Sequence, residues 1–337
     1  MKNRHYNIPI FLPELACPFQ CVYCDQRKIT GQKNVLSDIE IIDSINTYLQ
    51  SFKSENRCVQ LAFFGGTFTG LSMREQEHYL KLVQVYLQEK SIQGIRISTR
   101  PDYINLENLR LLKLYGVTHI ELGAQSLVEE VLQASHRGHS IDDVQKASEL
   151  IIKEGFTLGL QMMIGLPKDS PERSLQTARR IMEFGAKETR IYPTIVIRGT
   201  NLEQLWQKGI YKALNTQSAI EQSAELYQYF EKNSIKVLRV GLYPSEELST
   251  QGEAVAGPKM PHFKEKVLTY IWKNLLEAEI DFSKKGKSLA IAVSPKEYNF
   301  AVGFEASNRK YLEAYFPKVK FSINPKIEGR NYEVVYS

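Results

Sequence analysis

The sequence predicts an α/β protein: a partial (βα)6 TIM-like barrel followed by a small C-terminal α/β domain. Short apolar runs alternate with helical patterns through the first two-thirds of the 337 residues. They recur at a spacing of about 30 residues, which is typical of βα units. Several runs are continuously apolar, as expected of parallel strands that are covered on both faces. Barrels of this kind place their chemistry at the C-terminal ends of the strands.

The apolar runs predict six strands, at Tyr6–Leu12, Val59–Phe64, Ile95–Thr99, His119–Gly123, Thr157–Ile164 and Arg190–Thr194. The helical patterns between them predict helices at Asp38–Phe52, Met73–Gln88, Leu106–Leu114, Ile141–Lys153 and Pro171–Phe184. A later stretch, Val237–Pro244, is expected to close or extend the sheet. We therefore expect a barrel domain over residues 1–245 and a C-terminal extension over residues 246–337.

Composition allows one large core and a small satellite domain, since 43% of the residues are hydrophobic. The net charge of +5 permits an anionic partner without requiring one. No apolar run reaches the length of a membrane span, and the N-terminus lacks the apolar stretch of a signal peptide. We expect a cytoplasmic protein without a membrane partner.

Three of the four cysteines, Cys17, Cys21 and Cys24, lie in one short loop after the first expected strand. Clustered thiolates ordinarily bind a metal or an iron–sulfur cluster, and three of them leave one coordination position open. A structural zinc site is the alternative, and it would need a distant fourth ligand such as His5. Cys58 falls within the second expected strand and is interpreted as core.

Polar motifs follow the next strands. Gly65, Gly66 and Thr67 come after the second strand, where two glycines form either a plain turn or a close approach to a ligand. Thr99 and Arg100 follow the third strand, and Gln125 and Ser126 follow the fourth. Because the ends of parallel strands share one edge of a sheet, these residues are candidates to line a cofactor site.

Four further residues are candidates for catalysis: His136, His139, Tyr192 and Arg198. The two histidines flank a glycine in H-R-G-H, which is either a loop capped by Ser140 before a helix or a substrate clamp and proton shuttle. Tyr192 and Arg198 lie at the end of the sixth strand, and an arginine within an apolar stretch is less easily explained as core.

The spacing C-x3-C-x-aromatic-C, with Tyr23 as the aromatic residue, resembles the signature of the radical S-adenosylmethionine (radical SAM) superfamily. The resemblance implies a [4Fe–4S] cluster on the three cysteines, with S-adenosylmethionine (SAM) bound at the open iron. It implies that an electron, from a donor such as flavodoxin or ferredoxin, cleaves SAM to a 5′-deoxyadenosyl radical. It also implies that Tyr23 and the glycine motif contact the cofactors.

Four longer strings resemble the catalytic subunit family of the elongator complex over about residues 6–245. They are G-G-T-F, S-T-R-P-D, E-L-G-A-Q-S followed by H-R-G-H-S, and R-I-Y-P-T-I-V-I-R-G-T. The resemblance implies a transfer RNA (tRNA) nucleoside as the substrate. The chain departs from that family in its short spacing between the first two cysteines. It also has only about 90 residues after the barrel, too few for the family's acetyltransferase domain, so use of acetyl-CoA does not carry over.

Two other functions remain open at this point. One is radical SAM chemistry on a small molecule, as in the porphyrinogen oxidases. The other is a non-catalytic protein that senses SAM or iron, or merely binds RNA. The intact cysteines and G-G-T-F favour an enzyme over the non-catalytic protein.

The C-terminal extension shows a β-α-turn-α-β order: a strand at Ser288–Val293, a helix capped by Ser294 through Phe300, a second helix through Ala314 and a strand at Val319–Ile323. This order resembles the core of a KH-type RNA-binding fold, although its G-x-x-G loop lacks the second glycine. Basic and aromatic residues surround the loop, namely Lys296, Arg309, Lys310, Lys318, Lys320, Tyr298, Phe304 and Tyr311. The alternative is a small domain that caps the barrel.

Overall fold

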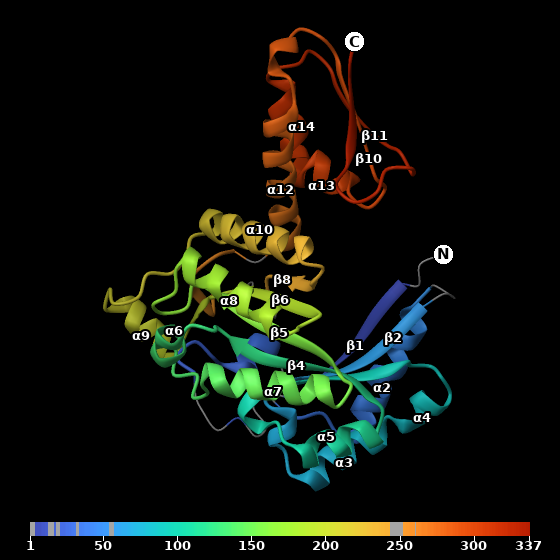
Figure 1. Cartoon of the computed structure of the whole chain (residues 1–337), viewed down its shortest axis with the longest axis vertical. Coiled ribbons are helices and arrows are strands. Elements are labelled where there is room, and N and C mark those ends of the chain that lie inside the picture. The colour runs from blue at the N-terminus through green and yellow to red at the C-terminus, as the bar shows by residue number, and fades with distance from the viewer. Residues whose placement is uncertain are drawn as a thin grey trace. The chain divides into compact units, whose positions relative to one another are not determined.

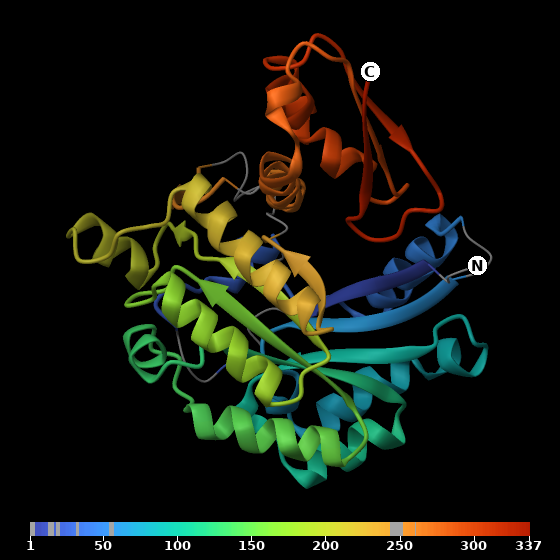
Figure 2. The ribbon, with the colours of Figure 1, turned by 45° about the horizontal axis from the view of Figure 1, so that its top comes forward.

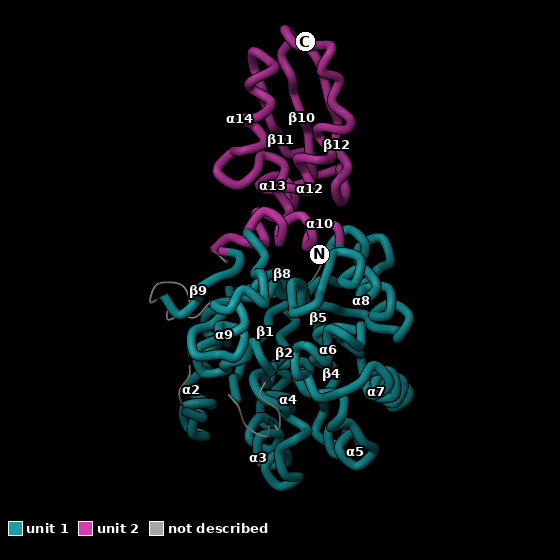
Figure 3. Tube along the Cα trace, turned by 90° about the vertical axis from the view of Figure 1, so that its left-hand side faces the viewer, with its two compact units in different colours: residues 1–215, 226–258 teal, residues 216–225, 259–337 magenta. Residues whose placement is uncertain are grey.

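The computed structural model describes residues 4–12, 17, 21–31, 34–53, 57–242, 252–259 and 261–337. The chain divides into two compact units (Figure 3). Unit 1 comprises Met1–Asn215 and Leu226–Pro258, and unit 2 comprises Thr216–Glu225 and Lys259–Ser337. The boundary expected at residue 245 lies outside the described residues.

Unit 1 is built on a curled sheet of seven strands in the order β1-β2-β3-β4-β5-β6-β8 (Figure 2). All six neighbouring pairs are parallel. The strands are β1 Arg4–Leu12, β2 Arg57–Gly65, β3 Gly94–Thr99, β4 Val117–Gln125, β5 Thr157–Ile164, β6 Glu188–Pro193 and β8 Lys236–Val240. The predicted fold class is confirmed, and the late apolar stretch extends the sheet as β8.

Helices between the strands pack on the outer face of this sheet (Figure 1). The long ones are α2 Asp38–Ser51, α3 Met73–Leu82, α5 Leu106–Leu114, α7 Ile141–Lys153 and α8 Pro171–Glu183. Serine and carboxylate side chains form capping boxes at the starts of α2, α3 and α7. The single helix predicted at Met73–Gln88 is wrong, because Val83 adopts φ −101° and ψ 0° and separates α3 from α4 Gln84–Gln88.

Shorter elements complete unit 1. They are α1 Gln26–Thr30, α6 Glu129–Ala134, α9 Asn201–Gln207, and the antiparallel pair β7 Val196–Ile197 and β9 Ala254–Ala256. Helix α10, Thr216–Lys232, begins in unit 2 and ends in unit 1. Within the described ranges, no helix is long and apolar enough to cross a bilayer.

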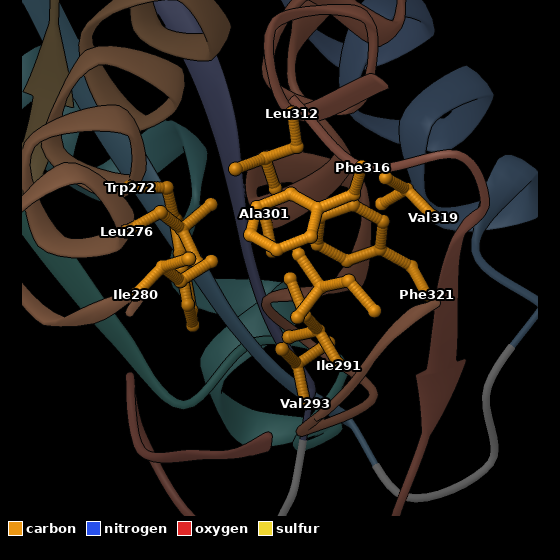
Figure 4. Close-up of a cluster of buried hydrophobic side chains, with 11 residues drawn as sticks. Trp272, Leu276, Ile280, Ile291, Val293, Ala301, Leu312, Phe316, Val319 and Phe321 are labelled. Carbon is orange, nitrogen blue, oxygen red and sulfur yellow. The ribbon is translucent and has the colours of Figure 1, made fainter. Parts of the chain in front are cut away.

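Unit 2 has a three-stranded sheet in the order β11-β10-β12, and Figure 3 labels its three strands. Strands β10 Leu289–Val293 and β11 Val319–Ile323 are parallel, and β12 Tyr332–Tyr336 is antiparallel to β10. The long helix α12 Phe263–Glu279 and the short helices α13 Tyr298–Val302 and α14 Ser307–Glu313 accompany the sheet. Their apolar side chains form one core that includes Trp272, Leu312 and Phe316 (Figure 4).

The predicted β-α-turn-α-β order is present in unit 2, but the predicted cap is wrong. Helix α13 begins at Tyr298, and Ser294 does not cap it because its Oγ donates a hydrogen bond to the carbonyl of Gly329 (3.0 Å). The turn between the helices contains left-handed residues at Gly303, Glu305 and Ala306. Helix α12 and strand β12 were absent from the predictions.

Candidate functional site

The cysteine loop lies beyond the end of β1 and is held by backbone hydrogen bonds on both sides. The N–H of Val22 donates to the carbonyl of Ser135 (3.2 Å), which follows α6. The carbonyl of Val22 accepts from the N–H of Leu202 (2.7 Å) in α9. A turn brings the N–H of Cys24 to 3.1 Å from the carbonyl of Cys21. This part of the loop therefore has a fixed backbone before any ligand binds.

The three loop cysteines differ in exposure, with Cys21 buried, Cys24 partly buried and Cys17 exposed. The Sγ of Cys21 accepts a hydrogen bond from Nη1 of Arg137 (3.6 Å), and the Sγ of Cys24 accepts one from Nε2 of Gln26 (3.7 Å). Burial, together with negative charge on Cys21 and Cys17, raises the pKa of Cys24 to about 12. The thiols therefore lie close enough to interact electrostatically.

Cys58 and His5 lie away from this loop. They are register partners near the N-terminal ends of β2 and β1, whereas the cysteine loop follows the C-terminal end of β1. Cys58 is partly buried within β2, as predicted. These two residues thus do not complete a four-ligand zinc site with the loop cysteines.

Arg137 is the residue that the sequence analysis missed. Its guanidinium is buried and also donates from Nη2 to the carbonyl of Gly123 (2.8 Å) at the end of β4. A Cβ on Gly123 would lie 2.9 Å from Nη2 of Arg137 and 3.0 Å from Nε2 of Gln125, so a larger residue there would displace these two side chains. Among the described residues, Nε of Arg137 has no hydrogen-bond partner. The sequence signal for Arg137 is the H-R-G-H motif, in which it stands between the two candidate histidines.

The glycine motif after β2 adopts a backbone that other residues disfavour. Gly65 has a φ of +96°, and a Cβ there would lie 2.7 Å from the carbonyl oxygen of Leu12. The Oγ1 of Thr67 is buried and has no hydrogen-bond partner in the described part of the chain. Gly65, Gly66 and Thr67 line a cavity of about 10 Å³, which is room for one water molecule. The hydroxyl of Thr67 at this edge is therefore available to a ligand.

Thr99 and Arg100 hold neighbouring loops in place. The Oγ1 of Thr99 lies 2.7 Å from Oγ1 of Thr69 in the turn after the glycine motif. Arg100 pairs with both carboxylate oxygens of Asp102 at 2.9 Å, and its Nη1 donates to the carbonyl of Arg137 (2.9 Å). The guanidinium of Arg100 is thus already engaged, and it positions the segment that carries Arg137.

Gln125 and Ser126 differ in what they contact. Gln125 has a left-handed backbone (φ +63°), and its Oε1 accepts a hydrogen bond from Nε2 of Gln161 (3.0 Å) in β5. Ser126 is buried, and its Oγ accepts from the N–H of Val128 (3.2 Å). Gln125 therefore lies beside Arg137 at the mouth of the barrel, while Ser126 organises the following turn.

The structure separates the two histidines. His136 is exposed, whereas His139 is buried and its Nε2 lies 3.3 Å from the carbonyl oxygen of Ala124. Burial lowers the pKa of His139 to about 3, and the Arg137 and Arg100 cations add to the effect. His139 is therefore neutral at physiological pH. Ser140 caps α7 through a capping box, as the simpler interpretation of this loop predicted.

Tyr192 and Arg198 also lie apart. Tyr192, in β6, is half-buried, and its hydroxyl lies 3.5 Å from Nη1 of Arg190. Arg198 is exposed, and its Nη2 contacts the carbonyl of Gly252 (3.4 Å). The loop before α9, next to Arg198, lines one side of a cavity of about 180 Å³. Cys21 and Cys24 line the other side of this cavity.

An ion-pair network fills the barrel below this mouth. Nη1 of Arg96 lies 2.8 Å from Glu121 Oε1 and 2.7 Å from Glu188 Oε2, and Arg190 also pairs with Glu121. Burial alone would raise the pKa of Glu121, but the Arg190 and Arg96 cations hold it below its usual value. A buried carboxylate requires a cationic or hydrogen-bonding partner, and Glu121 has two, Arg96 and Arg190.

The residues of the mouth suit an iron–sulfur cluster with an anionic ligand. Within the described residues, no three His, Cys, Asp or Glu side chains converge on a single metal ion. In a [4Fe–4S] cluster each thiolate binds a different iron, so its cysteines need not converge on one point. Arg137, the nearest buried cation, donates to one thiol and has an unsatisfied N–H. Such donors to the sulfurs are typical of the surroundings of these clusters.

Comparison with known proteins identifies the family. Residues 15–181 match the family model of the Radical SAM superfamily, and residues 186–273 match that of the Radical_SAM C-terminal domain. The tRNA uridine(34) acetyltransferase of Dehalococcoides mccartyi is 28% identical over 237 residues, which are 60% of this chain and 52% of that protein. Elongator complex protein 3 of Homo sapiens is 31% identical over 188 residues, 50% of this chain and 34% of that protein.

The chain thus spans about a third to a half of the length of these curated relatives. Among solved structures, the archaeal Methanocaldococcus infernus Elp3 with an N-terminus deletion (1-46) has a TM-score of 0.64 at 22% identity, covering 82% of this chain and 64% of that one. This likeness shows a shared fold. The chain belongs to the radical SAM superfamily, whose members are enzymes that in general use SAM and an iron–sulfur cluster, and within it the chain is elongator-like.

Proposed function

We propose that this protein is a radical SAM enzyme that carries a [4Fe–4S] cluster on Cys17, Cys21 and Cys24 and modifies a tRNA nucleoside. The observation that carries the proposal is the buried guanidinium of Arg137, which donates to the Cys21 thiol at 3.6 Å and has no carboxylate partner among the described residues. A buried cation is costly unless an anion compensates it. A cluster held by thiolates and an anionic ligand beside it would provide that compensation.

The residues of the mouth take distinct roles in this proposal. The three thiolates hold the cluster, which when bound supplies the electron that cleaves SAM to a 5′-deoxyadenosyl radical. Arg137 receives the carboxylate of SAM, in place of Arg100, which Asp102 already engages. His139 stays neutral beside Arg137, so it does not add a second cation that would compete for the same anion.

Three further groups orient SAM in this proposal. The backbone groups of Gly65 and Gly66 and the unsatisfied hydroxyl of Thr67 contact its methionine part. Gln125, next to Arg137, offers its amide to the ribose or the substrate. Tyr23 is buried against Val131 and Leu166, where it shields the cluster from water.

The substrate class is supported by the relatives that the chain resembles. Their names describe a tRNA uridine(34) acetyltransferase and elongator complex protein 3. We propose a tRNA nucleoside, with uridine as the first to test, and the proposal covers radical formation and attack on that nucleoside. The acetyl transfer in the relatives' names is outside the proposal, because the chain covers only part of those proteins.

The test is anaerobic reconstitution with iron and sulfide, followed by dithionite and SAM with or without bulk tRNA. We expect about four irons per chain and 5′-deoxyadenosine formation that tRNA stimulates. The variant Cys24→Ser should lose most of the bound iron. The matched control is Cys58→Ser, which removes the cysteine in β2 and should keep the wild-type iron content.

Three outcomes would decide against parts of the proposal. Equal iron loss in both cysteine variants would reject the loop as the cluster site. A loaded protein that forms no 5′-deoxyadenosine would favour a non-catalytic sensor. Formation that tRNA leaves unchanged would favour a small-molecule substrate, such as a porphyrinogen.

A further inference from the structure

Independently of the barrel site, we infer that unit 2 carries an RNA-binding surface in which the exposed ring of Tyr315 and three partly buried aromatic rings lie among lysines. We call it the ring–lysine surface, and we define it by Lys273, Phe282, Lys284, Lys285, Lys287, Lys310, Tyr311, Tyr315 and Tyr336. The inference rests on the proposed RNA substrate and adds to it a second contact, made by residues that, except for Lys273, follow the stretch that matches the family models.

The rings of this surface form a continuous cluster. Phe282 lies edge-on to Tyr315, with ring centroids 5.1 Å apart, and Tyr311 lies 5.4 Å from Tyr315. The ring of Phe316 lies 5.9 Å from Phe282 and 6.1 Å from Tyr336. Because Phe316 belongs to the core of unit 2 (Figure 4), these rings are anchored in fixed positions. Tyr315 keeps 44% of its surface exposed and can stack with a base.

Lysines flank the rings on either side of the cluster. The Nζ of Lys273 lies 5.4 Å from the ring centroid of Tyr311, and the Nζ of Lys284 lies 4.5 Å from that of Tyr336. Lys285 and Lys287 follow Lys284 in the same turn, and Lys310 precedes Tyr311. Lys285, Lys287 and Lys310 are exposed. The ammonium groups of these lysines therefore lie around rings that are partly accessible to solvent.

The charge balance of this region favours an anionic partner. Residues 259–337 contain 14 lysines and arginines against 9 aspartates and glutamates, an excess as large as the net charge of +5 of the whole chain. Glu277 and Asp281 lie 3.6 Å and 3.3 Å from Lys273 and Lys284. Exposed ion pairs of this kind contribute about 0–1 kcal/mol, so phosphate groups can replace them.

The pairing of rings with cations identifies RNA as the partner. Proteins that bind single-stranded nucleic acid stack bases on aromatic side chains and follow the phosphates with lysine and arginine. A protein partner would call for a wide apolar patch with few lysines at its centre. Phe304 does not join the surface, since its ring is covered by His262 (5.0 Å) and Lys266 (5.4 Å). Arg309 pairs with Glu313 (2.8 Å).

The experiment measures tRNA affinity of the full-length chain by fluorescence anisotropy over a range of salt concentrations. The test variant changes Lys284, Lys285 and Lys287 to glutamine. The matched control changes Lys296, Lys320 and Lys326 to glutamine, because these are also three exposed lysines of unit 2 but lie after β10, on β11 and in the turn after β11. Both variants lose the same charge, so only the location differs.

We expect the test variant to bind tRNA at least tenfold more weakly at low salt. Its slope of log K against log[salt] should flatten by about 2, roughly 0.7–0.9 for each lost phosphate contact. The control should change affinity less than about threefold. Tyr315→Ala should weaken binding about fivefold or more through lost stacking, and Tyr315→Phe should retain it. Unchanged thermal unfolding would show that each variant is folded.

The outcomes distinguish this inference from the proposed function. If the wild-type chain binds no tRNA at low salt, the RNA part of the proposed function fails. If the wild type binds and both triple variants weaken equally, binding follows overall charge and the ring–lysine surface is rejected. Tyr315→Ala with wild-type affinity would also reject it. Formation of 5′-deoxyadenosine without RNA should be the same in every variant, since none of these residues belongs to the barrel.

Discussion

Two regions of the barrel contain buried arginines: the ion-pair network, which we call the floor, and the mouth. The groups that balance the arginine charges differ between the two regions. On the floor, two arginines and two glutamates, Arg96, Arg190, Glu121 and Glu188, compensate one another across three strands. At the mouth, the buried Arg137 donates to a thiol and a carbonyl, and one of its N–H groups has no hydrogen-bond partner among the described residues. Nε of Arg96 on the floor also has no hydrogen-bond partner among the described residues, so the regions differ in their carboxylates: Arg96 and Arg190 each pair with at least one, and Arg137 pairs with none in the described part of the chain.

This difference indicates what each group of residues is for. A compensated buried network rigidifies the structure, and breaking it by removing one partner is strongly destabilising. An uncompensated buried cation lowers stability and is retained for what it binds. Substitutions on the floor should therefore act mainly on stability, and substitutions at the mouth mainly on ligand affinity.

The largest effect on stability is expected from Glu121→Gln. The amide keeps the size of the side chain but leaves Arg96 and Arg190 facing each other with one fewer carboxylate. We expect the free energy of unfolding to fall by about 3–5 kcal/mol, measured by chemical denaturation of the cluster-free protein. The control Asp142→Asn removes an exposed partner of Lys146 and should change it by less than about 0.5 kcal/mol. Similar small changes in both variants would contradict the division between floor and mouth.

A smaller loss of stability is expected from Gly123→Ala, at the boundary between the two regions. The added methyl group would lie 2.9 Å from Nη2 of Arg137 and 3.0 Å from Nε2 of Gln125, so both side chains must shift. We expect a loss of about 1–3 kcal/mol in unfolding free energy, together with weaker SAM binding by the reconstituted protein. Gly155→Ala is the comparison: a Cβ there meets no atom within 4 Å, but its φ of +85° strains an alanine, so this variant should lose stability and keep wild-type SAM affinity. A stability loss with unchanged SAM affinity would show that Arg137 does not contact SAM.

The sequence predicts the sheet of unit 1 well because each buried strand corresponds to a continuous apolar run in the sequence. All six predicted strands overlap observed ones with ends within two residues, and β5 is matched at both ends. Buried strands show as apolar runs, and serine caps mark the helix starts. The break at Val83 could not be predicted, because the apolar periodicity continues through it into α4.

The mouth was harder to predict because its key contacts join distant residues. Cys21 and Arg137 are 116 positions apart, and their contact depends on the loop after α6. Arg100 was a natural candidate from its place at the end of β3, but Asp102, two residues later, engages it. Strand ends indicate which residues share an edge of the sheet. They do not indicate which cation is already paired with a carboxylate.

A pH-dependent effect is expected from His139, which lies at the mouth. Its folded pKa of about 3 is below the unfolded value of about 6.5, so the unfolded chain binds a proton that the folded chain excludes. Stability should fall as pH drops below about 6.5, by about 1.4 kcal/mol per pH unit. His139→Gln should remove this dependence, as measured by denaturation at pH 7.5 and pH 5.5. His136→Gln, at an exposed position, is the control and should leave the pH dependence as it is in the wild type.

The smallest change in stability is expected from Arg137→Gln, although this residue is more buried than most arginines. The variant loses hydrogen bonds to Cys21 and Gly123 but also removes an uncompensated buried charge, so the unfolding free energy of the cluster-free protein should change by about 1 kcal/mol or less. The affinity of the reconstituted protein for SAM should fall about tenfold or more, because a charge-assisted hydrogen bond is lost. Arg137→Lys keeps the charge and should recover part of that affinity. A loss of several kcal/mol with unchanged SAM affinity would mean that Arg137 resembles the arginines of the floor, and that the anion it meets is the cluster's thiolates alone.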